Sequence, residues 1–165
     1  MKKILLALLV LPFISCTGPT NPNYEKNLAT AQKLFTLHGE ENLEAQLALL
    51  SEDMTMEPAA YGSKTLNKEA FGDLLKGYHM AFDEINFEAN VWLPGTDEQG
   101  NLDGSVRTYG TWTGVSASSG IRLNLKSYHF LNFNAEGLIQ QQGDFFDATG
   151  MMNATSIQEP VTTEE

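Results

Sequence analysis

The chain has few of the residues from which metal sites and nucleic-acid sites are built. It contains one cysteine and three histidines, and its ten lysines and arginines face 21 aspartates and glutamates. A structural zinc site takes about four cysteine or histidine ligands, and a nucleic-acid backbone is bound by positive charge. The sequence also has no glycine-rich loop of the kind that holds phosphates. We therefore expect no metal, no cofactor and no nucleic-acid partner.

A run of apolar residues long enough to cross a membrane is also missing. The apolar stretch 4–13 follows Lys2 and Lys3, is interrupted by Pro12 and stops before Ser15. A bilayer crossing needs about twenty apolar residues. A charged start, a short apolar stretch and a small-residue exit are the layout of a secretory signal. The single cysteine, Cys16, stands at that exit, and the segment therefore resembles a bacterial lipoprotein signal.

The resemblance implies that residues 1–15 are removed and that Cys16 is lipidated and becomes the new N-terminus. Lipidation would also protect an otherwise unpaired thiol in an oxidising compartment. The expected location is outside the cytoplasm, on a bacterial membrane, most simply the periplasmic face of the outer membrane. A plain signal peptide is the alternative, because Phe13 and Ile14 are bulkier than the residues usual before a lipoprotein cysteine.

After the leader, the chain reads as one domain between two polar ends. Its 8 basic and 21 acidic residues give a balance of −13, which repels nucleic acid and anionic lipid headgroups, so acyl chains would be the membrane contact. Residues 16–23 hold two prolines and predict a tether. Residues 24–155 form the domain, and residues 156–165 predict a flexible tail.

The periodicity of apolar residues changes within the domain from helical to alternating. Helices are predicted for 28–38, for a short segment capped by Asn42, and for a segment that starts near Asn67 and reaches Phe82. A short strand at 54–57 lies between the last two helices. Longer strands follow from Ile85 onward, and we assign them to residues 85–93, 105–115, 121–133 and 138–146. Helices first and long antiparallel strands afterwards predict an α+β fold with the helices on one face of the sheet.

Several short segments in this order resemble the nuclear transport factor 2-like superfamily, most closely its SnoaL-like polyketide cyclase branch. They are 42–44 (NLE), 49–53 (LLSED), 110–114 (GTWTG), 133–139 (FNAEGLI) and 144–152 (DFFDATGMM). The resemblance covers residues 24–154. It implies a cone, in which a strongly curved antiparallel sheet wraps around three N-terminal helices and one apolar pocket. Asn153-Ala154-Thr155 departs from the usual Gln-Leu-Gly and leaves the C-terminal helix of the family open.

Members of this superfamily include isomerases, cyclases, dehydratases, epoxide hydrolases and domains that only bind, so the fold does not choose a function. Three hypotheses follow. The domain binds a small apolar molecule, it is a cofactor-independent isomerase, cyclase or hydrolase, or it is a dimerisation or partner-binding module that pairs through its sheet.

The expected turn at 134–137 indicates which side chains point into the cone. With Asn134 opposite Leu138, His129 faces Gly143. The inward face of the strand at 121–133 then carries Leu123, Leu125, His129, Leu131 and Phe133. The neighbouring strand adds Ile139, Gln141, Phe145 and Asp147 to this face. With Val115 opposite Ile121, Tyr109, Thr111 and Thr113 join this face and Arg107 stands opposite His129. The predicted ligand-binding residues are Tyr78, Trp92, Arg107, Tyr109, Leu125 and Phe145.

Three residues are candidates for acid–base chemistry in that pocket. His129 on an apolar face suits a general base or acid, although single buried histidines with a purely structural hydrogen bond are common and are the alternative. Asp144 matches the position of the acidic residue in SnoaL-like cyclases, whereas Asp147 has the inward parity but also suits a helix N-cap. His38, at a helix end, suggests a surface role, and His79 an edge of the core.

Overall fold

Helices occupy the first part of the domain and long strands the second. The computed structural model describes residues 21–156; the leader, Cys16, most of the tether and nearly all of the tail lie outside that range. The elements in chain order are α1 (Tyr24–Gly39), α2 (Leu43–Leu47), β1 (Leu50–Glu57), α3 (Lys68–Ala81), β2 (Phe82–Thr96), β3 (Leu102–Ser116), β4 (Arg122–Phe133), β5 (Ile139–Phe145) and α4 (Ala148–Thr155).

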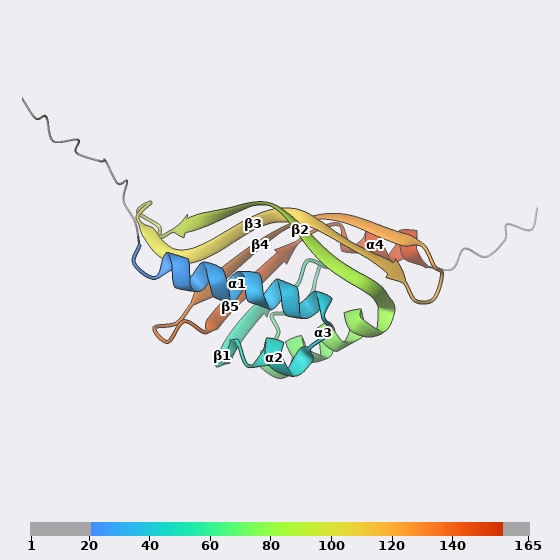
Figure 1. Cartoon of the computed structure of the whole chain (residues 1–165), viewed down its shortest axis with the longest axis horizontal. Helices are drawn as coiled ribbons and strands as arrows, with labels where there is room; N and C mark the ends of the chain where they lie inside the picture. The colour runs from blue at the N-terminus through green and yellow to red at the C-terminus, as the bar shows by residue number, and fades with distance from the viewer. Residues whose placement is uncertain (1–20, 157–165) are drawn as a thin grey trace, which may run out of the picture.

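The five strands form one curved sheet in the order β1-β5-β4-β3-β2. Helices α1, α2 and α3 lie on its concave side, so that the sheet arches over them (Figure 1). This arrangement confirms the predicted α+β cone. One pairing departs from the antiparallel expectation, because β1 runs parallel to β5. The two strands are joined by most of the domain rather than by a hairpin, so no tight turn imposes opposite directions.

Side-chain caps fix where the helices begin. The side chain of Asn42 accepts a hydrogen bond from the backbone N–H of Ala45 at 3.2 Å, and that of Asn67 accepts one from Ala70 at 2.9 Å. The Asn42 cap and a helix start near Asn67 were predicted, and each cap satisfies an N–H that the first turn leaves unpaired. Asp147 does the same for α4 by accepting from the N–H of Gly150 at 2.8 Å. The C-terminal helix that the sequence left open is therefore present.

The main core lies between α1, α3 and the sheet. Its most deeply buried side chains are apolar and come from every layer: Ala31, Met54, Met56, Phe71, Val106, Leu131 and Ile139. Burial of one large apolar side chain stabilises a fold by roughly 1.5–3 kcal/mol. Within residues 21–156, no helix is both long enough and apolar enough to cross a membrane.

The hairpin between β4 and β5 explains why the predicted facing of β5 is wrong. The turn itself forms as expected: the N–H of Asn134 donates to the carbonyl of Leu138 at 2.9 Å, and Gly137 has the left-handed φ of 84°. Phe133 pairs with Ile139, but Asn132 pairs with Gln141, so Gln140 is an extra residue in a bulge. A bulge reverses the alternation beyond it.

The consequences of this bulge reach the predicted site. His129 pairs with Asp144, and Phe130 rather than His129 pairs with Gly143. The predicted open space beside His129 is absent, because the ring of Phe130 lies over Gly143 on the outer face. Phe145, which the unbroken alternation pointed inward, is 53% exposed.

The hairpin between β3 and β4 also differs from the prediction by one residue. The N–H of Ser116 donates to the carbonyl of Ile121 at 2.9 Å, and Val115 pairs with Arg122 instead of Ile121. His129 therefore stands opposite Thr108 and not opposite Arg107. A shift of one residue moves the side chains of a strand to the other face, so the residues of β3 that point inward include Val106, Thr108 and Trp112.

Candidate active site

The concave side of the sheet and the helices enclose a cavity of about 80 Å³. That is several times the roughly 10–15 Å³ that one water molecule needs. Most of its wall is apolar and comes from α1, α3, β4 and α4, for example Leu34, Phe71, Leu125 and Met151. The polar groups on the wall are His38, Gln46, Tyr78, Thr113, His129, Gln142 and Asp144. A mostly apolar wall with a few converging polar groups is the usual form of a small-molecule site.

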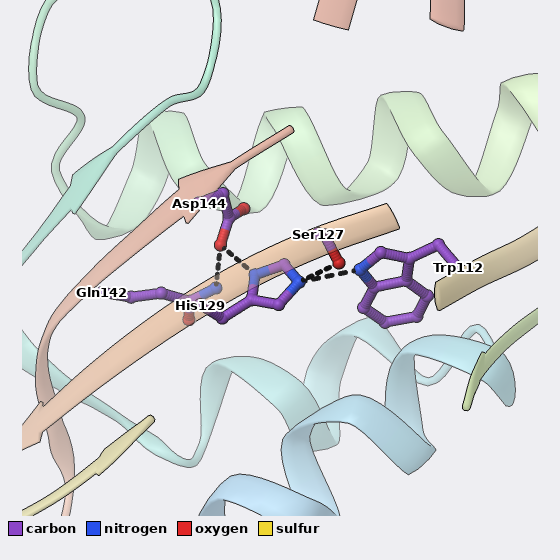
Figure 2. Close-up of polar contacts among 5 residues, drawn as sticks. All are labelled: Trp112, Ser127, His129, Gln142 and Asp144. Atoms are coloured by element: carbon purple, nitrogen blue, oxygen red, sulfur yellow. Dashed lines mark hydrogen bonds and ion pairs between the residues drawn. The ribbon is translucent and has the colours of Figure 1, made fainter. Parts of the chain in front are cut away.

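His129 is the centre of a polar cluster on the sheet side of this cavity (Figure 2). Its Nδ1 lies 2.7 Å from Oδ1 of Asp144 on β5. Its Nε2 lies 3.0 Å from the indole Nε1 of Trp112 on β3 and 2.8 Å from Oγ of Ser127 on β4. The histidine side chain is 2% exposed, so both ring nitrogens are engaged by protein groups inside the fold.

The indole of Trp112 determines which nitrogen of His129 carries the proton. An indole N–H only donates hydrogen bonds, so the Nε2 that it reaches must present its lone pair. The proton of the neutral ring is then on Nδ1, where it donates to Asp144. Stacking holds the indole in place, since Trp112 lies nearly parallel to the ring of Phe35 at 5.3 Å between centroids. His129 is thus a neutral donor toward Asp144.

Asp144 is oriented by two donors and keeps one oxygen available. Its Oδ1 accepts from Nδ1 of His129 and, at 3.2 Å, from the amide Nε2 of Gln142. Among residues 21–156, Oδ2 makes no hydrogen bond, and the side chain is 13% exposed. The amide of Gln142 must point its NH₂ group at the carboxylate, and its Oε1 is buried without a partner in the same range. Asp144 therefore presents one carboxylate oxygen beside an apolar wall.

The helix side of the cavity carries a second pair of histidines. His38 in the last turn of α1 and His79 in the last turn of α3 are joined by a hydrogen bond of 2.8 Å between Nδ1 of His38 and Nε2 of His79. Burial, and secondarily the neighbouring His79, lower the pKa of His38 to about 4. Tyr78 adjoins this pair, and burial, with a smaller contribution from Asp144, raises the pKa of its phenol to about 12. Both groups are neutral at pH 7.

Five of the predicted site residues are outside the cavity wall. Asp147 is exposed and caps α4, so it does not share the pocket with His129. Trp92 packs edge-on against Phe35 at 5.5 Å and is not part of the lining. Arg107, Tyr109 and Phe145 lie on the outer face, where Arg107 stands over the ring of Phe130 at 5.5 Å. The register shift and the bulge turned these three outward.

Four of the predicted site residues do line the cavity: His129, Asp144, Tyr78 and Leu125. Leu123 and Thr113 of the predicted inward face line it as well. His38 lines it as well and is 9% exposed, so its predicted surface role is wrong. Its helix turn packs under the sheet, where its ring meets Trp112 edge-on at 5.2 Å.

The partners of His129 and Asp144 were not predicted. The registers observed for β3–β4 and β4–β5 bring in Trp112 and Gln142, and Ser127 shares the inward face of β4 with His129. Within the described range 21–156, no group of three or more histidine, cysteine, aspartate or glutamate side chains is arranged to hold a metal ion.

Comparison with known proteins gives structural likeness only. No family model and no curated protein matches this sequence. A protein from Bacillus subtilis classed as an isomerase superimposes with a TM-score of 0.68 at 17% identity, over 84% of this chain and 100% of that one.

Two further solved structures have the same fold at similar identity. A protein from Shewanella denitrificans OS-217 classed as a SnoaL-like polyketide cyclase gives a TM-score of 0.63 at 14% identity, over 78% of this chain and 96% of its own. The BvnE pinacolase from Penicillium brevicompactum gives 0.63 at 19% identity, over 76% and 88%. The chain therefore has the cone-shaped nuclear transport factor 2-like fold that SnoaL-like polyketide cyclases and ketosteroid isomerase-like proteins share.

Proposed function

We propose that the domain binds a small, mostly apolar molecule in the cavity and that Asp144 takes a proton from it. The observation that carries this proposal is the carboxylate itself, held at Oδ1 by His129 and Gln142 with Oδ2 unpaired at an apolar wall. A general base must be positioned, unprotonated and within reach of the proton it removes. Asp144 meets the geometric part of that requirement.

In this proposal His129 positions the base rather than acting as one. Its Nε2 lone pair is occupied by the donors Trp112 and Ser127, and its Nδ1–H points at Asp144. The reaction class that fits is removal of a proton from a carbon next to a carbonyl, as in an isomerisation or a cyclisation, without a cofactor. The isomerase and cyclase descriptions of two of the similar structures support this class.

A base in an apolar cavity can be tested without knowing the natural substrate. The probe is 5-nitro-1,2-benzisoxazole: a base takes the C3 proton, the C–H electron pair forms a nitrile, and the N–O bond breaks to release a coloured phenolate. We expect Asp144→Asn to reduce turnover by about 10²–10⁴-fold, the range that a positioned base contributes. Asp147→Asn is the matched control and should leave turnover unchanged, because this carboxylate only caps α4. Equal rates for wild type and Asp144→Asn would refute the proposal.

A second candidate function is pairing of two copies through the outer face of the sheet. In the register of the sheet, Val91, Tyr109, Tyr128 and Phe145 lie in one row across four strands. Val91, Tyr109 and Phe145 are 38%, 51% and 53% exposed, and a two-fold axis would bring such a row onto its own copy. Sedimentation velocity of the wild type and of Tyr109→Lys tests this: a monomer in both cases would refute it.

We further propose that the domain is held at a membrane by a lipid on Cys16. The support is the leader sequence alone, with its two lysines, short apolar stretch and single cysteine. Mass spectrometry of the N-terminal peptide from the native host should find acyl chains on Cys16. An unmodified cysteine after a cleaved leader would favour the plain signal peptide instead.

A further inference from the structure

We propose that His38 and His79 form a proton relay between solvent and the cavity, in which His38 exchanges a proton with a bound molecule opposite Asp144. The proposal rests on the proposed function, because it supplies the acid that complements the base Asp144. It goes beyond that function in assigning a role to two histidines on the helix side of the cavity.

The first support is the position of the two rings. His38 lines the cavity and is 9% exposed, whereas His79 is half-buried and is not part of the lining. The hydrogen bond of 2.8 Å between them therefore passes through the wall. Because the bond uses Nδ1 of His38, Nε2 is the nitrogen available to a bound molecule, which would compete there with the neighbouring side chain of Gln46. The edges of Tyr78 and Trp112 fix the orientation of the ring.

The second support is that both rings favour the neutral form. A hydrogen bond between two imidazoles needs a lone pair on one of them, so the pair holds at most one extra proton. Burial, and then His79, lower the pKa of His38, while Asp144 and Gln46 act in the opposite direction and His129 adds a small lowering. Burial also lowers the pKa of His79, against a raising effect of Glu41. Together with the phenol of Tyr78, these are the titratable and polar groups that residues 21–156 place against the pair.

The neutral pair has two arrangements of its ring protons, and one arrangement becomes the other when each ring loses a proton from Nε2 and gains one at Nδ1. In one arrangement, Nε2–H of His79 donates to Nδ1 of His38, and His38 carries its own proton on Nε2, toward the cavity. When a bound oxygen takes that proton, His38 gains the Nε2 proton of His79 at Nδ1, and His79 gains a proton from water at its Nδ1. Each ring starts and ends neutral, and the net change is one proton moved from solvent to the bound molecule. No charge remains in the low-dielectric wall, where it would be costly.

A purely structural role would be a hydrogen bond that ties α1 to α3. The variant His79→Gln separates the two roles, because its amide nitrogen can occupy the place of Nε2 and donate to His38. An amide keeps its proton, however, and cannot pass it on. His79→Gln therefore retains the tie between the helices and interrupts the relay.

The direct test needs no ligand. In ¹⁵N-labelled protein at pH 7, the exchange of the His38 ring N–H with water is measured by water-exchange spectra in the wild type and in His79→Gln. We expect the exchange in the variant to be slower by about tenfold or more, because it must then wait for local opening of the wall. Equal exchange rates in two folded proteins would overturn the relay, whatever Asp144 does.

A second measurement tests the relay during turnover. Unsubstituted 1,2-benzisoxazole releases a more basic oxygen than its 5-nitro derivative and gains more from a proton donor. We expect His38→Asn to slow the unsubstituted probe about tenfold or more while it slows the nitro probe about threefold at most. Equal slowing of both probes counts against the relay. Failure of Asp144→Asn to affect either probe would count against the proposed function alone, because the water-exchange result is independent of Asp144.

Discussion

The buried His38 should make the stability of the fold depend on pH in a defined window. Its pKa is about 4 in the folded protein, against an ordinary value of 6.5. Between these two values the unfolded chain binds a proton that the folded chain does not. The free energy of unfolding therefore falls as the pH falls from 6.5 toward 4, and the full contribution of the neutral histidine is present above pH 6.5.

The magnitude follows from the distance between the two pKa values. One proton bound only by the unfolded state changes the free energy of unfolding by about 1.4 kcal/mol per pH unit. Between pH 7 and pH 5, His38 should thus remove about 2 kcal/mol, and the whole window is worth about 3 kcal/mol. His79 changes stability in the same direction, because burial also lowers its pKa.

Urea unfolding at pH 7 and pH 5 measures this effect in the wild type and in His38→Asn. The variant does not titrate at this position, so its free energy of unfolding should fall by about 2 kcal/mol less than that of the wild type over the same interval. The carboxylates that titrate near pH 5 are common to both proteins and cancel in the difference. If both proteins lose the same free energy to within about 0.5 kcal/mol, His38 is not a buried neutral histidine and the reasoning fails.

Three other substitutions, the first with a matched surface control, test the core, the polar cluster and the cavity. Leu131→Ala removes a side chain that is 0% exposed and should lower the free energy of unfolding in urea by about 2–5 kcal/mol. Leu93→Ala, at a position 40% exposed, should lower it by less than about 1 kcal/mol. Similar losses in the two variants would contradict the assigned core. Trp112→Phe removes the N–H donor to His129 but keeps an aromatic ring, so unfolding free energy should fall by about 1 kcal/mol, whereas no change would mean that the bond is not made. Leu125→Trp places a larger ring at the cavity wall. It should weaken the binding of 2-naphthol, measured by the fluorescence of this probe, about tenfold or more, which is a change of about 1.4 kcal/mol in binding free energy. Undiminished binding would mean that the probe binds elsewhere.

The sequence alone determined the elements and the class of the fold. Helical spacing in α1 and α3, the cap Asn42, the start of α3 near Asn67 and the alternation of β4 are local properties, and the structure confirms them. Local patterns are reliable here because side chains three and four apart, or two apart, share a face wherever the backbone is regular. The inward face of β4, with Leu125 and His129, followed from that alternation alone.

The composition of the site was decided by tertiary structure. One extra residue at Gln140 and one residue of shift in the β3–β4 hairpin changed the partner of His129 from Gly143 to Asp144 and brought Trp112 inward. No local pattern marks such a shift, since strand register is set by turn geometry and by what packs on each face. The pairing of His38 with His79, 41 residues apart, likewise exists only because α1 and α3 meet beneath the sheet. The sequence therefore identified His129 and offered Asp144 as one of two acids, and the packing of distant strands and helices selected between them.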